Sequence, residues 1–305
     1  MRIAIVGAGG VGGYFGGRLA AAAADVHFIA RGAHLAALRS NGLTIRSPQG
    51  DTHVPTVNAT DDAASIGPVD LVLFCVKLYD MQSAAATVLP PLVGPSTMVV
   101  PTQNGVDAVS ALSKAVGAEH VAGGTTWLSA VIDEPGVIRH VAMGRLAFGA
   151  IRGEHPAVLR EFHDVCVKAG VDAKLSDRIL LDIWAKFVRL TVFSGITCIA
   201  RSPIGVCLEE PGLFALLDRA VHESVSVARG MQIPLPHSAY DDTLTGLRAL
   251  PPHAKASMLE DLERGRRLEL PWLSGAMARI GDEVGVETPT HDLFVTLLSP
   301  HANGH

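Results

Sequence analysis

A short apolar run that breaks directly into a glycine-rich turn opens the chain and constrains its fold more than any other feature. A strand is expected over residues 2–6, because the residues after Arg2 are apolar and largely β-branched, which is typical of a buried strand in a parallel sheet. The segment Gly7-Ala-Gly-Gly-Val-Gly12 follows at once with the spacing G-x-G-x-x-G. A helix is expected over residues 14–24 and a second strand over residues 26–30, so the chain is predicted to begin with a β-α-β unit.

This context predicts a dinucleotide-binding site on the turn. Gly7 would permit the tight turn, Gly9 would let a pyrophosphate approach the backbone, and Gly12 would let the helix pack close to the strand. The helix amides and dipole would face the phosphates. The predicted cofactor-binding residues of the turn are Gly7, Ala8, Gly9, Gly10, Val11 and Gly12. A flexible or closely packed glycine segment that binds no ligand is the less favoured alternative.

The residue after the second predicted strand indicates which dinucleotide binds. Arg31 stands where an aspartate or glutamate would accept the ribose hydroxyls of NAD, and an arginine there can pair with the 2′-phosphate of NADP. Asp25 does not favour NAD, because it precedes the predicted strand. We therefore predict NADP(H) as the cofactor, with Arg31 on its 2′-phosphate. His34 and Arg39 are further candidates for this phosphate, and the alternative for Arg31 is a solvated loop arginine.

Length and composition favour a globular enzyme of two domains. The 305 residues include 48% hydrophobic residues, and the net charge of −5 does not suggest a nucleic-acid partner. No long apolar run is free of charges and glycines, so no membrane span is expected. The histidines and cysteines lack metal-ligand spacing, which predicts no metal, free thiols and a cytoplasmic location. The cysteines are Cys75, Cys166, Cys198 and Cys207.

Alternating strand and helix signals predict an α/β fold, with a Rossmann-type doubly wound sheet in residues 1–174 and an all-α domain in residues 175–305. Later strands are expected over 43–46 and 53–57 as a hairpin, and over 70–76, 97–101, 121–126, 137–140 and 146–149. Helices are expected over 176–187, 211–231, 252–264 and 271–284. The tail 299–305 is expected to be disordered.

Four polar residues are candidates for chemistry at a carbonyl group, which needs a proton source and groups that bind the substrate. Lys77 and Asn104 follow predicted strand ends, Lys186 lies in an apolar helical segment, and Glu269 lies in a charged cluster. Each also has an ordinary interpretation: a lysine at a strand or helix surface, an Asn-Gly turn, or a solvated charge. A lysine at its ordinary pKa of about 10.4 would be cationic at neutral pH.

Together these segments resemble the ketopantoate reductase family (2-dehydropantoate 2-reductases) almost from end to end. The matching segments are Gly-Ala-Gly-Gly-Val-Gly, Leu-Phe-Cys-Val-Lys77, Gln-Asn104-Gly, Ile-Trp-Ala-Lys186-Phe and Ser257-Met-Leu-Glu-Asp, with Glu269 after them. The resemblance implies NADPH-dependent reduction of a small 2-oxo acid to a 2-hydroxy acid. For the family's own substrate this is ketopantoate reduction to pantoate, a step of pantothenate synthesis.

The same matching implies residue roles. Lys186 is similar to the catalytic lysine that gives its proton to the alkoxide, and Glu269 resembles the carboxylate that positions this lysine and contacts the substrate. Asn104 resembles the residue that holds nicotinamide and lysine, Lys77 the second active-site lysine, and Ser257 a substrate contact. Lys77 and Asn104 are therefore expected at both the cofactor and the substrate. A homodimer is also expected.

The chain departs from the family at the substrate wall. The asparagines usually found one and two turns after the catalytic lysine are replaced by Leu190 and Ser194, and the segment Glu269-Leu-Pro-Trp272-Leu-Ser-Gly275 replaces Glu-Ile-Asp-Tyr-Leu-Asn-Gly. Ser194 remains a predicted substrate contact, whereas Leu190 makes the wall apolar. Two alternatives therefore stay open: a reductase of a different, more apolar 2-oxo acid, and a dinucleotide-sensing protein without turnover.

Overall fold

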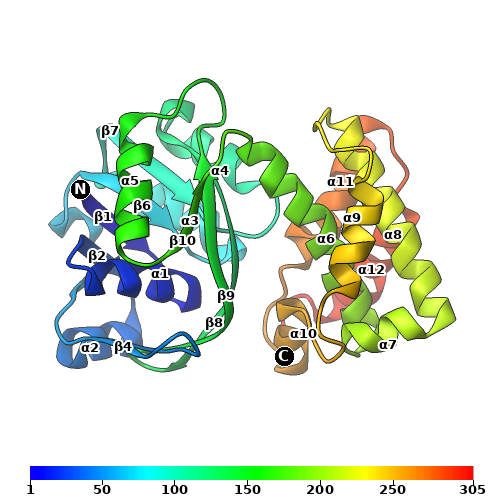
Figure 1. The fold of residues 1–305 in the computed structure, drawn as a ribbon, viewed down its shortest axis with the longest axis horizontal. Coiled ribbons are helices and arrows are strands. Elements are labelled where there is room, and N and C mark those ends of the chain that lie inside the picture. Colours follow the sequence, from blue (N-terminus) through cyan, green and yellow to red (C-terminus); the bar gives the residue numbers. More distant parts are fainter. Residues whose placement is uncertain (305) are drawn as a thin grey trace. The chain divides into compact units, whose positions relative to one another are not determined.

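The computed structural model describes residues 1–304, which divide into two compact units (Figure 1). The first unit comprises Met1–Gln103 and Asp107–Ile179, and the second comprises Asn104–Val106 together with the chain from Leu180 onward. The sequence placed the domain boundary between residues 174 and 175, at the end of the last strand of the first unit. The short segment Asn104–Val106 belongs with the second unit although the chain on both sides of it belongs to the first.

A five-stranded parallel sheet forms the centre of the first unit, as the sequence predicts. Its strand order is β5-β2-β1-β6-β7, and every pair of neighbours is parallel. Parallel strands buried on both faces read as continuous apolar runs, and β1 and β6 have this pattern. The strands are β1 (Arg2–Val6), β2 (Asp25–Ile29), β5 (Asn58–Thr60), β6 (Val69–Phe74) and β7 (Val93–Pro101).

The first unit also contains a second sheet, which has both parallel and antiparallel strand pairs. Its order is β10-β9-β3-β4, and β8 pairs antiparallel with β9. The predicted hairpin is confirmed as β3 and β4. The strands predicted over 137–140 and 146–149, and most of that predicted over 121–126, are parts of one long hairpin; Val121 precedes it and forms an isolated parallel bridge to Val99 of the parallel sheet. The strands are β3 (Leu43–Arg46), β4 (Thr52–Val54), β8 (Gly123–Glu134), β9 (Val137–Gly149) and β10 (Asp172–Leu175).

The long hairpin was divided wrongly because its middle is solvated. Val141, Ala142 and Met143 are exposed, and the register shifts opposite them, which interrupts the alternation of apolar and polar residues. Backbone pairing continues through this region, so the strand extends beyond the segments that periodicity marks.

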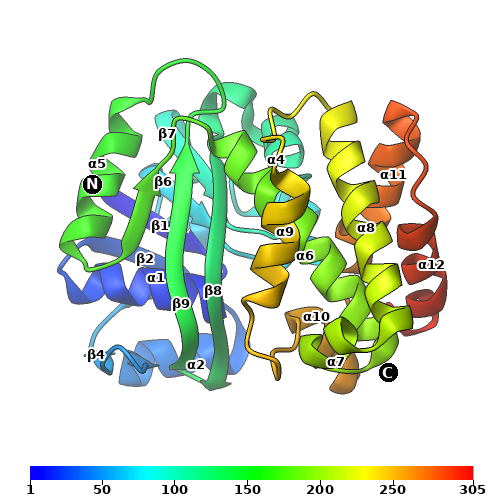
Figure 2. The same cartoon turned by 45° about the vertical axis from the view of Figure 1, so that its right-hand side comes forward.

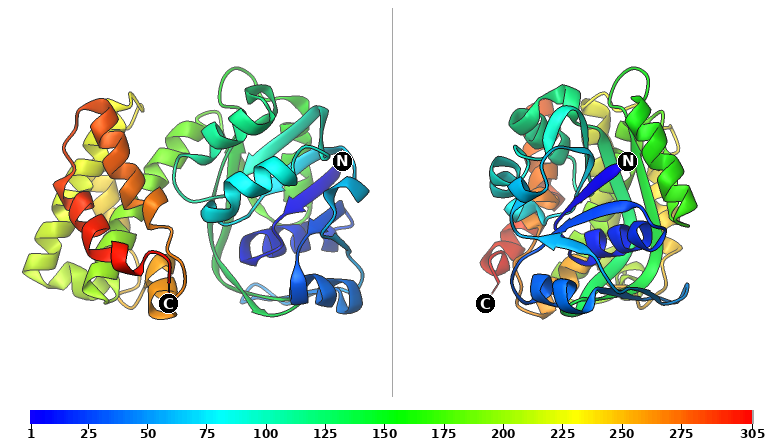
Figure 3. Two further views of the ribbon diagram at one scale, coloured as in Figure 1. Left: turned by 180° about the vertical axis from the view of Figure 1, so that it is seen from behind. Right: turned by 90° about the vertical axis from the view of Figure 1, so that its left-hand side faces the viewer.

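Helix α1 (Gly10–Ala21), a blue helix in the ribbon of Figure 3, contacts strands of both sheets. Its glycines make these contacts possible. A Cβ atom at Gly12 or Gly16 would lie 2.8 Å from side-chain atoms of Ile5 in β1. Cβ atoms at Gly13 and Gly17 would come equally close to side chains of β9 and β3. The glycine-rich helix is therefore required by packing on two sides. The other helices of this unit are α2 (Gly32–Asn41), α3 (Met81–Thr87), α4 (Ala108–Val116) and α5 (Ala157–Lys168).

The second unit is helical, as the sequence predicts (Figure 2). Among its described residues there is no strand, and the core lies between amphipathic helices that bury residues such as Phe187, Leu217, Leu259 and Phe294. Its helices are α6 (Ile179–Ala200), α7 (Ile204–Glu209), α8 (Pro211–Gly230), α9 (Ala239–Arg248), α10 (Ser257–Glu263), α11 (Ser274–Val284) and α12 (Pro289–Leu298). None of the helices within residues 1–304 has the length and apolarity needed to cross a membrane.

The end of the chain is folded rather than disordered. Ser299–His301 form a 3₁₀ turn, and the backbone N–H of Leu268 donates a 2.9 Å hydrogen bond to the carbonyl of Ala302. The polar composition of the tail did not reveal this pairing with a distant segment. The prediction of disorder is wrong for residues 299–304, and residue 305 lies outside the described residues.

Candidate active site

The glycine-rich turn has the geometry that a pyrophosphate needs. Gly7 has φ +94°, which permits the tight turn after β1, and a Cβ at Gly12 would lie 2.1 Å from the carbonyl oxygen of Gly7. Space around Gly9 is open, since no atom lies within 4 Å of the position of a Cβ there. The amides of Gly7 and Ala8 both donate to the carbonyl of Ile29. The amides of the first turn of α1, which have no partner within the helix, are therefore the ones suited to a phosphate.

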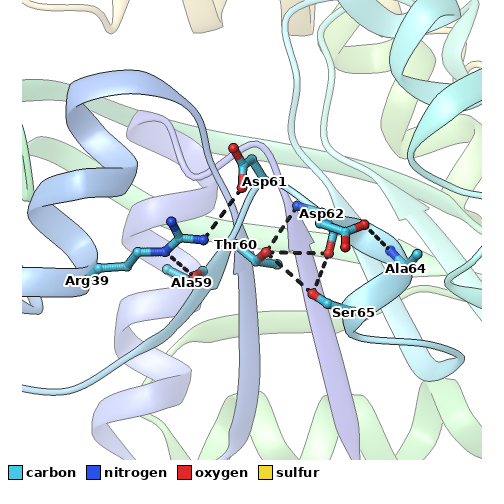
Figure 4. Close-up of polar contacts among 7 residues, drawn as sticks. All are labelled: Arg39, Ala59, Thr60, Asp61, Asp62, Ala64 and Ser65. Carbon is cyan, nitrogen blue, oxygen red and sulfur yellow. Dashed lines mark hydrogen bonds and ion pairs between the residues drawn. The ribbon is translucent and has the colours of Figure 1, made fainter.

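Arg31, His34 and Arg39 differ in the hydrogen bonds and ion pairs that their side chains already form. Arg31 is the exposed N-cap residue of α2, and its side chain forms no hydrogen bond or ion pair within residues 1–304. Arg39 donates from Nε to the carbonyl of Ala59 at 3.0 Å, and its Nη2 lies 3.5 Å from Asp61 Oδ1 (Figure 4). His34 accepts at Nδ1 a hydrogen bond from the N–H of Gly136, and burial lowers its pKa. Arg31 is thus the cation best suited to a 2′-phosphate.

In the second unit a chain of polar side chains joins three of the predicted catalytic and binding residues. Lys186 Nζ donates to Asn104 Oδ1 at 2.9 Å, and Asn104 Nδ2 donates to Glu269 Oε2 at 3.1 Å. Glu269 is only 7% exposed. A buried carboxylate is unfavourable without hydrogen bonds and a nearby cation, and this arrangement supplies an amide donor and places a lysine on the same amide.

The Asn-Gly pair predicted as a turn also brings Asn104 to its partners. Gly105 has φ +82°, and a Cβ there would lie 2.8 Å from the carbonyl oxygen of Trp272. Val106 packs against the helical core. Glu269 precedes the 3₁₀ turn Leu270–Trp272 and accepts backbone hydrogen bonds from the end of it. Both sides of the Asn104–Glu269 hydrogen bond are therefore held by backbone structure.

The electrostatic surroundings of Lys186 favour proton transfer near neutral pH. The pKa of Lys186 is lowered to about 8, chiefly by burial; the negative charge of Glu269 opposes this shift, and the positive charge of Arg189 adds to it. The ordinary pKa expected from the sequence is therefore corrected, because no sequence pattern reports how deeply the Nζ atom is buried. A group with this pKa is still largely protonated at neutral pH and gives up its proton far more readily than an ordinary lysine.

Comparison with known proteins identifies the family. A family sequence model described as "Ketopantoate reductase PanE/ApbA" matches residues 3–153, and one described as "Ketopantoate reductase PanE/ApbA C terminal" matches residues 178–302. The chain belongs to the ketopantoate reductase family. A curated relative, 2-dehydropantoate 2-reductase of Mesorhizobium japonicum, is 31% identical, with 98% of this chain and 97% of the relative covered. The protein is therefore an oxidoreductase of a dinucleotide-dependent family, as the resemblance implied.

Solved structures agree with this assignment. The crystal structure of 2-dehydropantoate 2-reductase from Geobacter metallireducens superposes with a TM-score of 0.91 at 30% identity, covering 98% of this chain and 99% of that one. A ternary structure of D-mandelate dehydrogenase with NADH and anilino(oxo)acetate gives a TM-score of 0.89 at 21% identity, covering 99% and 98%. At this lower identity the likeness establishes the shared fold alone.

The remaining candidates of this ketopantoate reductase family member are Lys77, Ser194 and Ser257, with Leu190 at the predicted substrate wall. Lys77 belongs to the first unit, where it is exposed just after β6. Ser194 is fully buried on α6, and its Oγ has no hydrogen-bond partner within residues 1–304. Ser257 is exposed at the first position of α10, and Leu190 packs half-buried against the helical core.

Two residues with a bearing on the site were missed from the sequence. Gln103 is buried and donates from Nε2 to the carbonyls of Phe74 and Val76, which ties the end of β7 to the end of β6 just before Asn104 and Lys77. Its position directly before Asn104 was the available signal. Arg189, whose charge acts on Lys186, was signalled only by being a charged residue in a largely apolar helical segment.

Proposed function

We propose that the protein reduces 2-dehydropantoate to pantoate with NADPH. The observation that carries the proposal is the hydrogen-bonded chain Lys186–Asn104–Glu269, in which the lysine has a pKa of about 8. Reduction of a 2-oxo acid needs a proton donor of this kind for the alkoxide that forms. Relatives from Mesorhizobium and Geobacter are named 2-dehydropantoate 2-reductase, which makes ketopantoate the leading candidate substrate.

The first unit fits the cofactor. NADPH, when bound, would supply the hydride for the carbonyl carbon. The residues proposed to hold its pyrophosphate are those of the turn from Gly7 to Gly12, and Arg31 would bind the 2′-phosphate as a planar cation with several donors. The support for NADP over NAD is the exposed guanidinium of Arg31, together with the absence of a carboxylate directly after β2. Lys77, which follows β6, is proposed to act at the nicotinamide end.

Within the second unit, Lys186 would donate its Nζ proton to the oxygen of the reduced carbonyl, becoming a neutral amine that water reprotonates. Asn104 accepts a hydrogen bond from Nζ and so fixes the direction in which the remaining protons point. Glu269 favours the charged lysine before transfer and also fixes the amide of Asn104. Ser194 and Ser257 remain proposed substrate contacts.

One observation favours a second candidate, a more apolar 2-oxo acid. Leu190 is an apolar residue on the helix that carries Lys186, and Trp272 is half-buried three residues after Glu269. A protein of the same fold, D-mandelate dehydrogenase, has been solved with the aromatic 2-oxo acid derivative anilino(oxo)acetate. A dinucleotide sensor without turnover is disfavoured, because a sensor does not require a proton donor with a lowered pKa. The homodimer remains a prediction.

Turnover assays separate these candidates. The purified protein would be mixed with NADPH and with ketopantoate, pyruvate, 2-oxoisovalerate or phenylglyoxylate, and the loss of reduced-nicotinamide absorbance would be followed. The highest kcat/KM with ketopantoate would support the first candidate. A higher value with phenylglyoxylate would favour the apolar one. Absence of turnover with every acid, while NADPH still binds, would contradict the enzymatic proposal.

A further inference from the structure

Arg189 lies one helical turn after Lys186 on α6 and has no partner for its charge. Residues one turn apart share a face of a helix, so the two cations are neighbours. Within residues 1–304 the guanidinium of Arg189 forms no hydrogen bond and no ion pair, although the residue is only partly exposed and burial lowers its pKa. The anion that the structure offers nearby, Glu269, is hydrogen-bonded to Asn104 instead.

Helix α9 restricts where the guanidinium can lie. A Cβ atom at Gly246 would be 2.8 Å from Arg189 Nη1 and 3.1 Å from Arg189 Cδ. The arginine side chain thus lies directly over the backbone of α9, at a position where glycine leaves the space. The charge remains close enough to Lys186 to lower the pKa of its ammonium group. The guanidinium is therefore held near the proton donor by packing rather than by an ionic partner.

An unpartnered, half-buried guanidinium is unfavourable by itself, because burial removes part of its hydration without replacing its hydrogen bonds. A bound anion would correct this. The planar fork of an arginine matches a carboxylate with two parallel hydrogen bonds. Every 2-oxo acid carries a carboxylate bonded directly to the carbon of the reacting carbonyl group. Two neighbouring cations therefore match two neighbouring oxygen-bearing groups.

We propose that Arg189 binds the carboxylate of the 2-oxo acid while Lys186 donates its proton to the oxygen of the carbonyl group. This inference rests on the proposed function and makes it more specific. Leu190, the next residue, has no polar group to offer a substrate, whereas Arg189 in the preceding position offers several hydrogen-bond donors and a charge. Substrate selection by this protein then depends on the carboxylate more than on the groups near Leu190.

Arg189→Met tests the role directly, with Arg189→Lys as the conservative variant. A hydrogen bond to a charged group is worth about 1.5–3 kcal/mol, so KM for the best 2-oxo acid should rise roughly 10–100-fold in Arg189→Met. The lysine variant should recover part of this loss. Arg248→Met is the matched control, because Arg248 lies on α9 over the ring of Phe214 and should leave KM unchanged. The methyl ester of the same acid should be used equally by wild type and Arg189→Met.

Gly246→Ala tests whether the position of the Arg189 guanidinium matters, because it shifts this group without removing its charge. The added methyl group would displace Nη1 of Arg189, while alanine favours a helix over glycine, so KM should rise without loss of thermal stability. If wild type prefers the acid over its ester and Arg189→Met keeps this preference, the proposed role of Arg189 is wrong, while the proposed reductase function still stands. Calorimetry with pantoate and NADP⁺ covers the case in which no acid is turned over. Equal affinity of wild type and Arg189→Met for pantoate, or no binding of pantoate by either protein, then contradicts the proposed role of Arg189.

Discussion

Lys186 donates a hydrogen bond of 2.9 Å to Asn104, a residue 82 positions earlier in the chain. The same amide donates to Glu269, so the orientation of the asparagine side chain is determined at both ends. A lysine ammonium can only donate and a carboxylate can only accept, so the oxygen of the amide must face Lys186 and the nitrogen must face Glu269. Asparagine at this position thus keeps a cation and an anion in fixed places.

Replacing this amide by an isosteric carboxylate should change the proton affinity of the lysine. In Asn104→Asp, two carboxylates would act on Lys186, and the pKa of the lysine should rise from its value of about 8. The alkaline limb of the pH profile of kcat should therefore move to higher pH, with a lower kcat at neutral pH because a stronger base is a weaker acid. Steady-state kinetics across the pH range would measure both effects. An unchanged alkaline limb would contradict a direct contact between residue 104 and Lys186.

The wild-type pH profile is itself predicted by the lowered pKa of Lys186. In the proposed mechanism reduction requires the protonated lysine, so kcat in this direction should be constant below about pH 8 and fall above it, as Lys186 loses its proton. Oxidation of the 2-hydroxy acid requires the neutral amine, so its rate should rise through the same pH. Opposite limbs with a shared midpoint would support the assignment. A reduction rate that stays constant well above pH 8 would contradict it.

Removal of the amine should affect turnover far more than cofactor binding. Lys186→Ala deletes the proposed proton donor, and general acid catalysis typically contributes about 100-fold or more to a rate. We expect kcat to fall by at least this factor, with an NADPH affinity close to that of wild type, because the glycine-rich turn and Arg31 belong to the first unit. Stopped-flow single turnovers and fluorescence titration of NADPH would provide the two numbers. Wild-type turnover would exclude Lys186 as the acid.

The sequence predicted the first unit well where local chemistry determines structure. A strand that ends in Gly7 specifies its turn through a positive φ angle, and the apolar runs of β1 and β6 specify buried strands. The β8–β9 hairpin was missed because its continuity depends on backbone pairing across an exposed stretch, which leaves no apolar period. The tail after Leu298 was misjudged for a similar reason, since its hydrogen bond to Leu268 involves only backbone atoms.

The site was predictable only in part. Lys186, Asn104 and Glu269 could be named because they match a family pattern, whereas spacing alone left ordinary alternatives for each. Neither the lowered pKa of Lys186 nor the burial of Glu269 could be read from the chain, because both depend on contacts between distant segments. Arg189 belongs to no motif, and only its position over α9 makes it a candidate.

The choice between the two nicotinamide cofactors can be tested at Arg31. Arg31→Ala removes the proposed partner of the 2′-phosphate, so the Kd for NADPH should rise roughly 10–100-fold while the Kd for NADH changes little. Arg39→Ala is the control, because this side chain is already bonded to the carbonyl of Ala59 and lies near Asp61. Equal weakening of both cofactors by Arg31→Ala would mean that Arg31 does not select the phosphate.

A buried histidine should make the second unit sensitive to acid. His291 is fully buried between α12 and α8, where its Nε2 lies 2.8 Å from Ser224 Oγ and 3.2 Å from the carbonyl oxygen of Ala220. Its Nδ1 is buried without a hydrogen-bond partner in the described chain. Protonation would place a proton and a charge on this unpartnered nitrogen, and burial accordingly lowers the pKa of His291 from 6.5 to about 4.

The sign of the effect on stability follows from this difference. In the unfolded chain the histidine takes up its proton near pH 6.5, whereas in the folded protein it does so only near pH 4, so acid favours the unfolded state. The free energy of unfolding should be highest above pH 6.5 and decline as the pH falls towards 4. His291→Gln cannot be protonated and should lose less stability over this range, and His222→Gln, at an exposed position, should behave like wild type. Urea unfolding at several pH values would measure the slopes, and equal slopes for wild type and His291→Gln would contradict the proposed linkage.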